Sequence, residues 1–190
     1  MNVLIIPEDF RKDQYILNPI FGRLFRDVGR PRARIKVCQD PLLGGVTEAM
    51  KSERLSEIFE RYDAMIDIFI LCVDRDGNKG RRRGLDQLEQ KFGDGRVFLA
   101  ENAWQELETW VLAGVELPPR WPWADVRAEV QVKEQYFDVL VEQRGLGDHP
   151  GGGRKPLAAE AAGRLAAIRR KCPEDFDALA QRIEAVVEPT

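Results

Sequence analysis

The fold of this chain is decided by the stretch Ile66-Asp67-Ile68-Phe69-Ile70-Leu71-Cys72-Val73-Asp74-Arg75-Asp76-Gly77. Its nearly continuous apolar run is typical of a strand buried on both faces of a sheet, so we expect it in a central position. The run ends in an Asp-x-Asp-Gly turn. Because alternate residues of an extended segment point the same way, Asp74 and Asp76 can reach the same metal ion. Asp and Gly also form ordinary turns after strands, so the turn alone is a weak signal for metal.

Alternating strands and helices surround this run. We expect three more strands, at Val3–Ile6, Ala33–Cys38 and Val97–Ala100, with the second of them nearer an edge of the sheet. Apolar residues at helical spacing separate the strands, and a further helix is expected from about Trp104 to Leu112. This strand–helix repeat predicts an α/β fold, a small, mostly parallel, Rossmann-like sheet flanked by helices.

The character of the chain changes near residue 117, where prolines and two tryptophans form a rigid turn. We therefore divide it into an α/β domain, residues 1–116, and a C-terminal helical extension, residues 117–190, packed on or beside that domain. In the extension we expect a helix from about Ala124 to Gln143, a flexible glycine-rich stretch, and a helical region from Pro156 to Val187. That last region is expected to break near Cys172-Pro173.

The composition excludes several classes of protein. The chain has 29 Lys and Arg against 32 Asp and Glu, which argues against a continuous nucleic-acid-binding surface but allows a local basic stripe. The 3 cysteines lack the paired spacing of a zinc site and an odd number does not suggest a disulfide framework. The apolar N-terminal run is too short for a signal peptide or a membrane span. We expect a soluble, cytoplasmic protein without a membrane partner.

Acidic residues follow the predicted strands. Glu8 and Asp9 come after the first strand, and Glu101 comes after the fourth. The carboxyl ends of parallel strands meet at one edge of the sheet, where ligands bind in open α/β folds. Acids gathered there repel one another unless a cation lies among them, and Mg²⁺ is the usual cation where phosphates are the substrate. We therefore predict a divalent-cation site at this edge, with Asp74 and Asp76 at its centre.

The order of these acids resembles the Toprim family, which has an acid after the first strand, Asp-x-Asp after a later central strand and a further Glu after the next. The resemblance rests on Leu4-Ile5-Ile6-Pro7-Glu8 and on Phe69-Ile70-Leu71-Cys72-Val73-Asp74-Arg75-Asp76-Gly77. Leu107-Glu108-Thr109-Trp110-Val111-Leu112-Ala113 and Lys171-Cys172-Pro173-Glu174-Asp175-Phe176-Asp177-Ala178-Leu179 are similar to a narrower group. Its members are small stand-alone Toprim-like proteins of unassigned function, often encoded beside ATPases in bacterial defence loci. With the tail included, the resemblance spans nearly the whole chain.

The resemblance implies a magnesium-dependent (or manganese-dependent) nuclease that cuts a phosphodiester in DNA or RNA, with DNA favoured as the substrate. It also implies work with a partner ATPase in phage defence or DNA metabolism. Asp74 and Asp76 would hold metal, and Glu8 would be a metal ligand or the general base for the attacking water. Glu108 would complete a second metal position, and the Glu-x-Trp motif favours it over Glu101 and Glu106. A solvated helix-face carboxylate is the alternative for Glu108.

Two groups of basic residues are candidates for phosphate contacts, because acids alone would repel DNA. Lys79, Arg81, Arg82 and Arg83 follow the metal motif directly, and a solvated helix start is the alternative for them. Arg154 and Lys155 follow three glycines and could close over a phosphate, unless this stretch is a plain linker. Related nucleases use a late lysine to stabilise transition-state charge, which implies Lys155 as a catalytic residue.

This chain departs from the Toprim pattern at Asp9, since those proteins usually have glycine immediately after the first Glu. A bulkier turn would still present Glu8, or the site has lost its activity. The second alternative predicts a catalytically inactive Toprim-like module that binds a partner ATPase through its helical tail. A small nucleotide-binding α/β protein is a third hypothesis, disfavoured because Walker A and Gly-x-Gly-x-x-Gly motifs are absent from the sequence. The sequence leaves homo-oligomer formation open.

Overall fold

The strands form one four-stranded sheet in which every neighbouring pair is parallel, in the order β2-β1-β3-β4. The computed structural model describes residues 1–187. Its strands are β1 (Asn2–Pro7), β2 (Arg34–Val37), β3 (Ile68–Asp74) and β4 (Val97–Ala103). The predicted α/β class is confirmed. The apolar run of β3 lies inside the sheet and β2 lies at an edge, as their sequence patterns predict.

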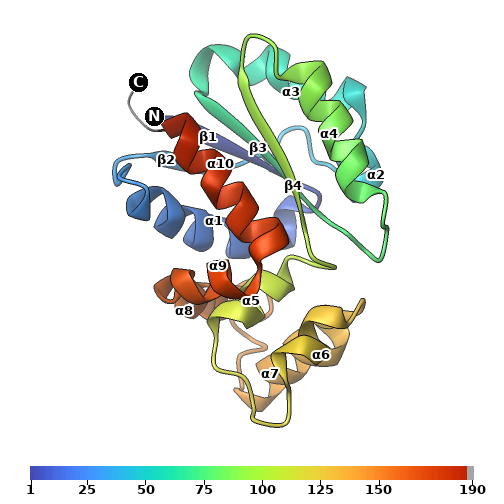
Figure 1. Cartoon of the computed structure of the whole chain (residues 1–190), viewed down its shortest axis with the longest axis vertical. Coiled ribbons are helices and arrows are strands. Elements are labelled where there is room, and N and C mark those ends of the chain that lie inside the picture. Colours follow the sequence, from blue (N-terminus) through green and yellow to red (C-terminus); the bar gives the residue numbers. More distant parts are fainter. Residues whose placement is uncertain (188–190) are drawn as a thin grey trace.

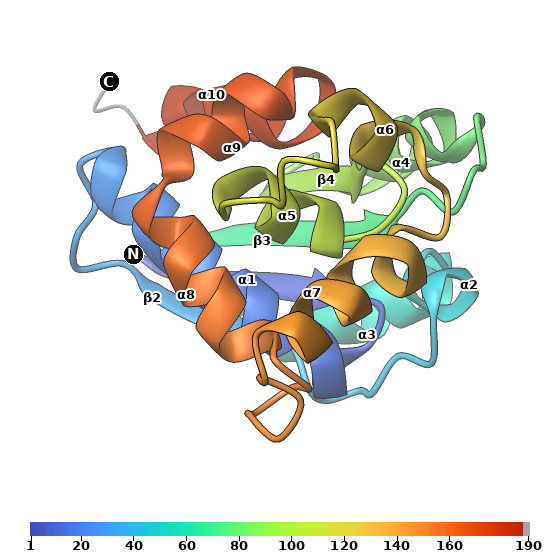
Figure 2. The same ribbon diagram turned by 90° about the horizontal axis from the view of Figure 1, so that it is seen from below.

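Helices cover both faces of the sheet (Figures 1 and 2). On β1, Val3 and Ile5 belong to one apolar cluster and Leu4 and Ile6 to another, because alternate residues of a strand face opposite sides. The first face carries α1 (Phe10–Asp27), α5 (Glu108–Gly114), α8 (Arg154–Gly163), α9 (Leu165–Lys171) and α10 (Ala178–Val187). The second face carries α2 (Val46–Ala49), α3 (Ser52–Tyr62) with the 3-10 turn η1 (Asp63–Met65), and α4 (Arg81–Phe92).

The C-terminal helices share the apolar core of the first face. Helix α8 contacts α1 and α5, and α10 contacts β4. Gly114 allows the close approach of α5 to α8, because a Cβ there would lie 2.7 Å from the Cα of Ala161. The helical extension therefore packs directly on the α/β part of the chain. Among residues 1–187, none of the helices combines the length and the hydrophobicity of a membrane span.

The expected single helix from Ala124 to Gln143 is wrong. The structure has α6 (Trp123–Ala128), the π-helical turn η2 (Lys133–Phe137) and α7 (Asp138–Gln143), with a break over residues 129–131. Two carboxylates accept hydrogen bonds from backbone N–H groups at this break. Glu129 Oε1 accepts a hydrogen bond from Gln131 N at 2.9 Å, and Glu106 Oε2 accepts one from Lys133 N at 2.7 Å. The predicted break near Cys172 is confirmed, and the π-helical turn η3 (Pro173–Asp177) follows it.

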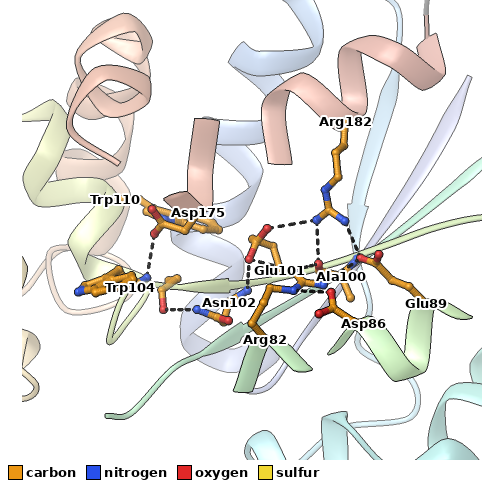
Figure 3. A network of polar contacts seen from close by, with 11 residues as sticks. Arg82, Asp86, Glu89, Ala100, Glu101, Asn102, Trp104, Trp110, Asp175 and Arg182 are labelled. Atoms are coloured by element: carbon orange, nitrogen blue, oxygen red, sulfur yellow. Dashed lines mark hydrogen bonds and ion pairs between the residues drawn. The ribbon is translucent and has the colours of Figure 1, made fainter. Parts of the chain in front are cut away.

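The carboxylate of Asp175 ties the C-terminal tail to the segment that follows β4 (Figure 3). Asp175 as a residue is 1% exposed. Asp175 Oδ2 accepts hydrogen bonds from Trp104 N and Trp110 Nε1, both at 2.8 Å, and both carboxylate oxygens accept from Arg127. This buried network fixes the start of the loop that leads from β4 into α5.

A second polar network closes the outer edge of β4 (Figure 3). Arg82 of α4 and Arg182 of α10 reach this edge from opposite faces of the sheet, and both donate to the carbonyl oxygen of Ala100, at 2.6 and 2.8 Å. Both also contact the carboxylate of Glu101. Arginines that cover the free carbonyl of an edge strand prevent it from pairing with another chain.

The expectation that the fourth strand ends at Ala100 is wrong. Its pairing with β3 continues from Cys72↔Glu101 to Asp74↔Ala103, so Glu101 lies inside β4 and not beyond it. Likewise, the helix expected from Trp104 begins only at Glu108. The four residues between them form a loop, and this loop decides which carboxylates meet Asp74.

Candidate metal centre

The two motifs with acidic residues meet where the strand order reverses. The chain passes from β1 to its neighbour β2 on one side and returns to β3 on the other side of β1. In open parallel sheets the carboxyl ends of two such strands form the crevice that binds ligands. Glu8 follows β1 and Asp74 ends β3, and Glu8 Oε2 lies 3.5 Å from Asp74 N. The two predicted ligands therefore lie together in this crevice.

Gln105 holds the Asp-x-Asp turn in shape. Its carbonyl oxygen accepts hydrogen bonds from Arg75 N at 2.8 Å and Asp76 N at 3.0 Å, and its side-chain Oε1 accepts one from Gly77 N at 2.8 Å. Asp76 and Gln105 both have left-handed backbones, with φ of 51° and 70°. Non-glycine residues keep such conformations only where surrounding contacts enforce them. These hydrogen bonds therefore fix the direction in which Asp76 presents its carboxylate.

Three carboxylates converge at this turn. Oxygen atoms of Asp74, Asp76 and Glu106 lie within 4.8 Å of one another. Asp74 Oδ1 accepts a hydrogen bond from Leu107 N at 2.8 Å, and Glu106 Oε2 accepts the one from Lys133 N. The second carboxylate oxygens, Asp74 Oδ2 and Glu106 Oε1, take no part in these two hydrogen bonds. A set of carboxylate oxygens fits a hard divalent cation such as Mg²⁺ or Mn²⁺.

Negative charge is concentrated around the centre. Burial raises the pKa of Asp74 well above its ordinary value, and the negative charges of Glu8 and Glu108 raise it further. Burial and the charge of Asp76 likewise raise the pKa of Glu8. Concentrating carboxylates in a partly buried place destabilises the folded protein, and a bound cation would offset that cost.

Asp13, a further carboxyl group, and Glu106 of the converging group also have raised pKa values. Burial raises the pKa of Asp13, in the first turn of α1, to about 8, and the charges of Glu108 and Glu8 contribute. Burial raises the pKa of Glu106 to about 7, with contributions from Glu108 and Glu134. Asp13 Oδ2 accepts a hydrogen bond from Asp9 N at 2.9 Å. Asp13 therefore contacts the residue that follows Glu8.

We expect the metal-free protein to become less stable as the pH rises from 6 to 8.5. The folded protein binds the protons of Asp13 and Glu106 more tightly than the unfolded chain does, whose carboxyl groups titrate near pH 4. The stabilisation by protonation is therefore complete near pH 4 and is lost as the pH passes 7 and 8. Thermal unfolding in EDTA should show a Tm at pH 6 that is about 5 °C or more above that at pH 8.5.

Added Mg²⁺ should flatten this pH dependence, because a cation compensates the carboxylates that form at high pH. The measurement is a series of thermal unfolding curves in EDTA and in Mg²⁺ across this range. A Tm in EDTA that is constant, or that rises with pH, would contradict the assignment of these buried carboxyl groups.

Glu108 and Arg154 form a buried ion pair beside the centre. Their exposed fractions are 6% and 7%. Glu108 Oε1 accepts hydrogen bonds from Arg154 Nε, at 2.9 Å, and from its Nη2, and Arg154 Nη1 donates to Gly151 O at 2.9 Å. The negative charge of Glu108 is thus neutralised by Arg154. Glu106, and not Glu108, is the third member of the converging group. The guanidinium of Arg154 is directed into the protein, so we assign it no contact with nucleic acid.

The other predicted basic residues have different surroundings. Arg82 is bound to the edge of β4, whereas Lys79 and Arg83 are exposed. Arg81 Nη2 lies 3.8 Å from Asp76 Oδ2. Lys155 is exposed at the start of α8, and its role as the late catalytic lysine stays a prediction.

The departure from the Toprim pattern at Asp9 has a structural explanation. Asp9 has an extended backbone, with φ −131° and ψ 93°, so this position does not require glycine. Its Oδ1 accepts a hydrogen bond from Arg11 N at 3.0 Å, the contact of a helix N-cap. Asp9 begins α1 and leaves the side chain of Glu8 at the crevice.

The sequence analysis missed Asp13 and Gln105. Asp13 follows Asp9 by one helical turn, and that spacing could have placed it on the same face of α1 as the acidic edge. Gln105 has no comparable signal, because a single glutamine in a loop has no pattern that predicts its partners.

No protein-family model matches this chain, and comparisons with curated proteins and with solved structures give no match either. The Toprim resemblance therefore stays a prediction from short motifs. The fold class and the converging carboxylates are the observations on which a function can be proposed.

Proposed function

We propose that this protein is a magnesium-dependent nuclease of the Toprim type that hydrolyses phosphodiester bonds in DNA. The observation that supports this function best is the convergence of Asp74, Asp76 and Glu106 at the carboxyl ends of β3 and β4. These three side chains would hold the cation, with Glu106 in the place that the motif comparison gave to Glu108. A bound divalent cation stabilises the negative charge that develops on phosphoryl oxygens during hydrolysis.

Glu8 is proposed as the general base. It lies beside Asp74 and lines an open hollow of about 440 Å³ together with Asp9, Arg11 and the loop 42–45. A hollow of this size can hold a small ligand or one unit of a polymer. From this position the carboxylate of Glu8 can accept a proton from a water that attacks a phosphorus atom held at the centre.

The substrate is assigned from the basic residues beside the centre. Lys79 and Arg83 are exposed near the Asp-x-Asp turn and at the start of α4, where they can contact backbone phosphates. A partner ATPase is proposed from the resemblance alone, as are a role in defence and a cytoplasmic location.

The test is cleavage of supercoiled plasmid and of single-stranded DNA in the presence of Mn²⁺. Replacing Glu8→Gln should slow cleavage by about 100-fold or more, because a general base contributes roughly 10²–10⁴-fold to the rate. The affinity for Mn²⁺ should change much less, since Asp74, Asp76 and Glu106 remain. Glu60→Gln, at an exposed position of α3, is the matched control and should cut like the wild type.

Two results would contradict this function. Equal cleavage by the wild type and Glu8→Gln would show that the activity does not arise at this site. A wild type that binds Mn²⁺ but cuts neither substrate, even with a candidate ATPase added, would favour the inactive interaction module.

A further inference from the structure

Arg81 has an unusual environment for a buried cation. Its side chain is 12% exposed. Its Nε is buried and has no hydrogen-bond acceptor among residues 1–187. Nη1 lies 3.5 Å from the sulfur of Met50, a weak acceptor, and Nη2 lies 3.8 Å from Asp76 Oδ2, beyond hydrogen-bond distance. A guanidinium with five N–H donors is therefore held beside the metal centre almost without acceptors.

Other arginines in the protein show what a satisfied environment looks like. Arg154 is similarly buried and donates from Nε, Nη1 and Nη2 to Glu108 and Gly151. Arg82 donates to Asp86, Ala100, Glu101 and Glu89. Unsatisfied buried donors are unfavourable, and in natural proteins they often mark the place of a ligand.

The position of Arg81 is fixed by packing. A Cβ at residue 84 would lie only 2.9 Å from the methyl group of Met50, so the glycine at position 84 leaves space for this side chain. Met50 in turn contacts Arg81 through its sulfur. These contacts hold the guanidinium at the start of α4, next to Asp76.

We propose that Arg81 binds a phosphoryl oxygen of the substrate directly, so that the substrate phosphate is held between Arg81 and the cation. The planar fork of a guanidinium matches the oxygens of a phosphate. A phosphate would accept from Nη2, which has no hydrogen-bond acceptor among residues 1–187 and, unlike Nε, is not a fully buried atom. This assignment separates Arg81 from its neighbours, since Arg82 is bound to the edge of β4 and Arg83 is exposed. It rests on the proposed function for the cation, while the contact between Arg81 and phosphate can be measured by itself.

The experiment is calorimetric titration with Mn²⁺ alone and then with thymidine 5′-monophosphate, at saturating Mn²⁺ and without metal. In Arg81→Gln, the Kd for the nucleotide should rise by about 10- to 100-fold, the range for hydrogen bonds to charged groups. The Kd for Mn²⁺ should stay the same or fall, because a cation next to Asp76 has been removed. Arg32→Gln, a change at an exposed arginine outside the site, is the control and should change the nucleotide Kd by less than about 3-fold, and Arg81→Lys should be intermediate.

The outcomes are distinguishable. Nucleotide binding by Arg81→Gln equal to that of the wild type would overturn the proposal, as would an equal loss in Arg32→Gln. Parallel losses of Mn²⁺ binding, nucleotide binding and Tm would also overturn it, because they indicate a structural role. If the wild type binds no Mn²⁺, the proposed function fails. Nucleotide binding that still depends on Arg81 without metal would then support the phosphate contact, and its absence would overturn that too.

Discussion

Replacing Asp74→Asn is expected to reduce DNA cleavage by about a thousandfold or more and to remove measurable Mn²⁺ binding. Asp74 is the carboxylate that lies beside both Glu8 and the other members of the converging group. Asparagine keeps an oxygen that can accept the hydrogen bond from Leu107 N, so the turn and the start of α5 should be preserved. What is lost is the negative charge that attracts the cation.

The same substitution should stabilise the metal-free protein. The pKa of Asp74 is raised by burial and by neighbouring carboxylates, so its ionised form opposes folding at neutral pH, and a neutral amide does not. We expect the Tm in EDTA at pH 8 to rise by about 2 °C or more, while the stabilisation by Mn²⁺ disappears. Asp94→Asn, an exposed change of the same charge, should alter neither property. Unchanged Mn²⁺ affinity in Asp74→Asn would rule out Asp74 as a ligand.

Replacing Asp175→Ala is expected to lower the free energy of unfolding by about 3–5 kcal/mol, the largest stability effect that we predict. The substitution leaves Arg127, Trp104 N and Trp110 Nε1 without their shared acceptor inside the protein. Because Trp104 begins the loop that carries Gln105 and Glu106, the loss should also weaken Mn²⁺ binding.

The neighbouring residue provides the control. Glu174 forms an ion pair with the same arginine, but its side chain is 62% exposed, so Glu174→Ala should cost less than about 1 kcal/mol. Urea denaturation of both variants in EDTA measures the difference. Similar losses in the two variants would show that burial of the Asp175 network does not stabilise the tail in the way we describe.

The sheet was predictable because its signals are local. A strand buried on both faces has to be apolar at successive positions, and the run that becomes β3 meets this condition in the sequence itself. Its acidic end then lies at the carboxyl edge because all neighbouring strands are parallel. The proximity of Glu8 and Asp74 follows from the pairing of β1 with β3, which the sequence analysis did not predict.

The third carboxylate was not predictable, because its position depends on contacts between distant residues. Whether Glu106 or Glu108 meets Asp74 is decided by where α5 begins. The start at Glu108 is fixed by hydrogen bonds from Leu107 N to Asp74 and from Trp104 N to Asp175, which are 33 and 71 residues away along the chain. The break before η2 was not predictable for the same reason, because Lys133 N donates to Glu106, which lies outside this helical segment.

The basic stretch after the Asp-x-Asp turn shows a similar limit. Arg81, Arg82 and Arg83 are chemically identical, but successive residues of a helix point about 100° apart. One therefore lies beside Asp76, the next covers the edge of β4 and the third is exposed. Their different environments appear only when the helix is placed on the sheet.

The most direct test of the central claim is the location of Mn²⁺ by anomalous diffraction from crystals of the wild-type protein grown or soaked with Mn²⁺. We predict an anomalous peak between the carboxylates of Asp74, Asp76 and Glu106, within about 2.0–2.6 Å of an oxygen from each, the range of hard-cation contacts. Arg154 should remain paired with Glu108. A peak coordinated by Glu108 without Glu106 would contradict the proposed metal site. So would crystals at saturating Mn²⁺ that show no peak beside these carboxylates.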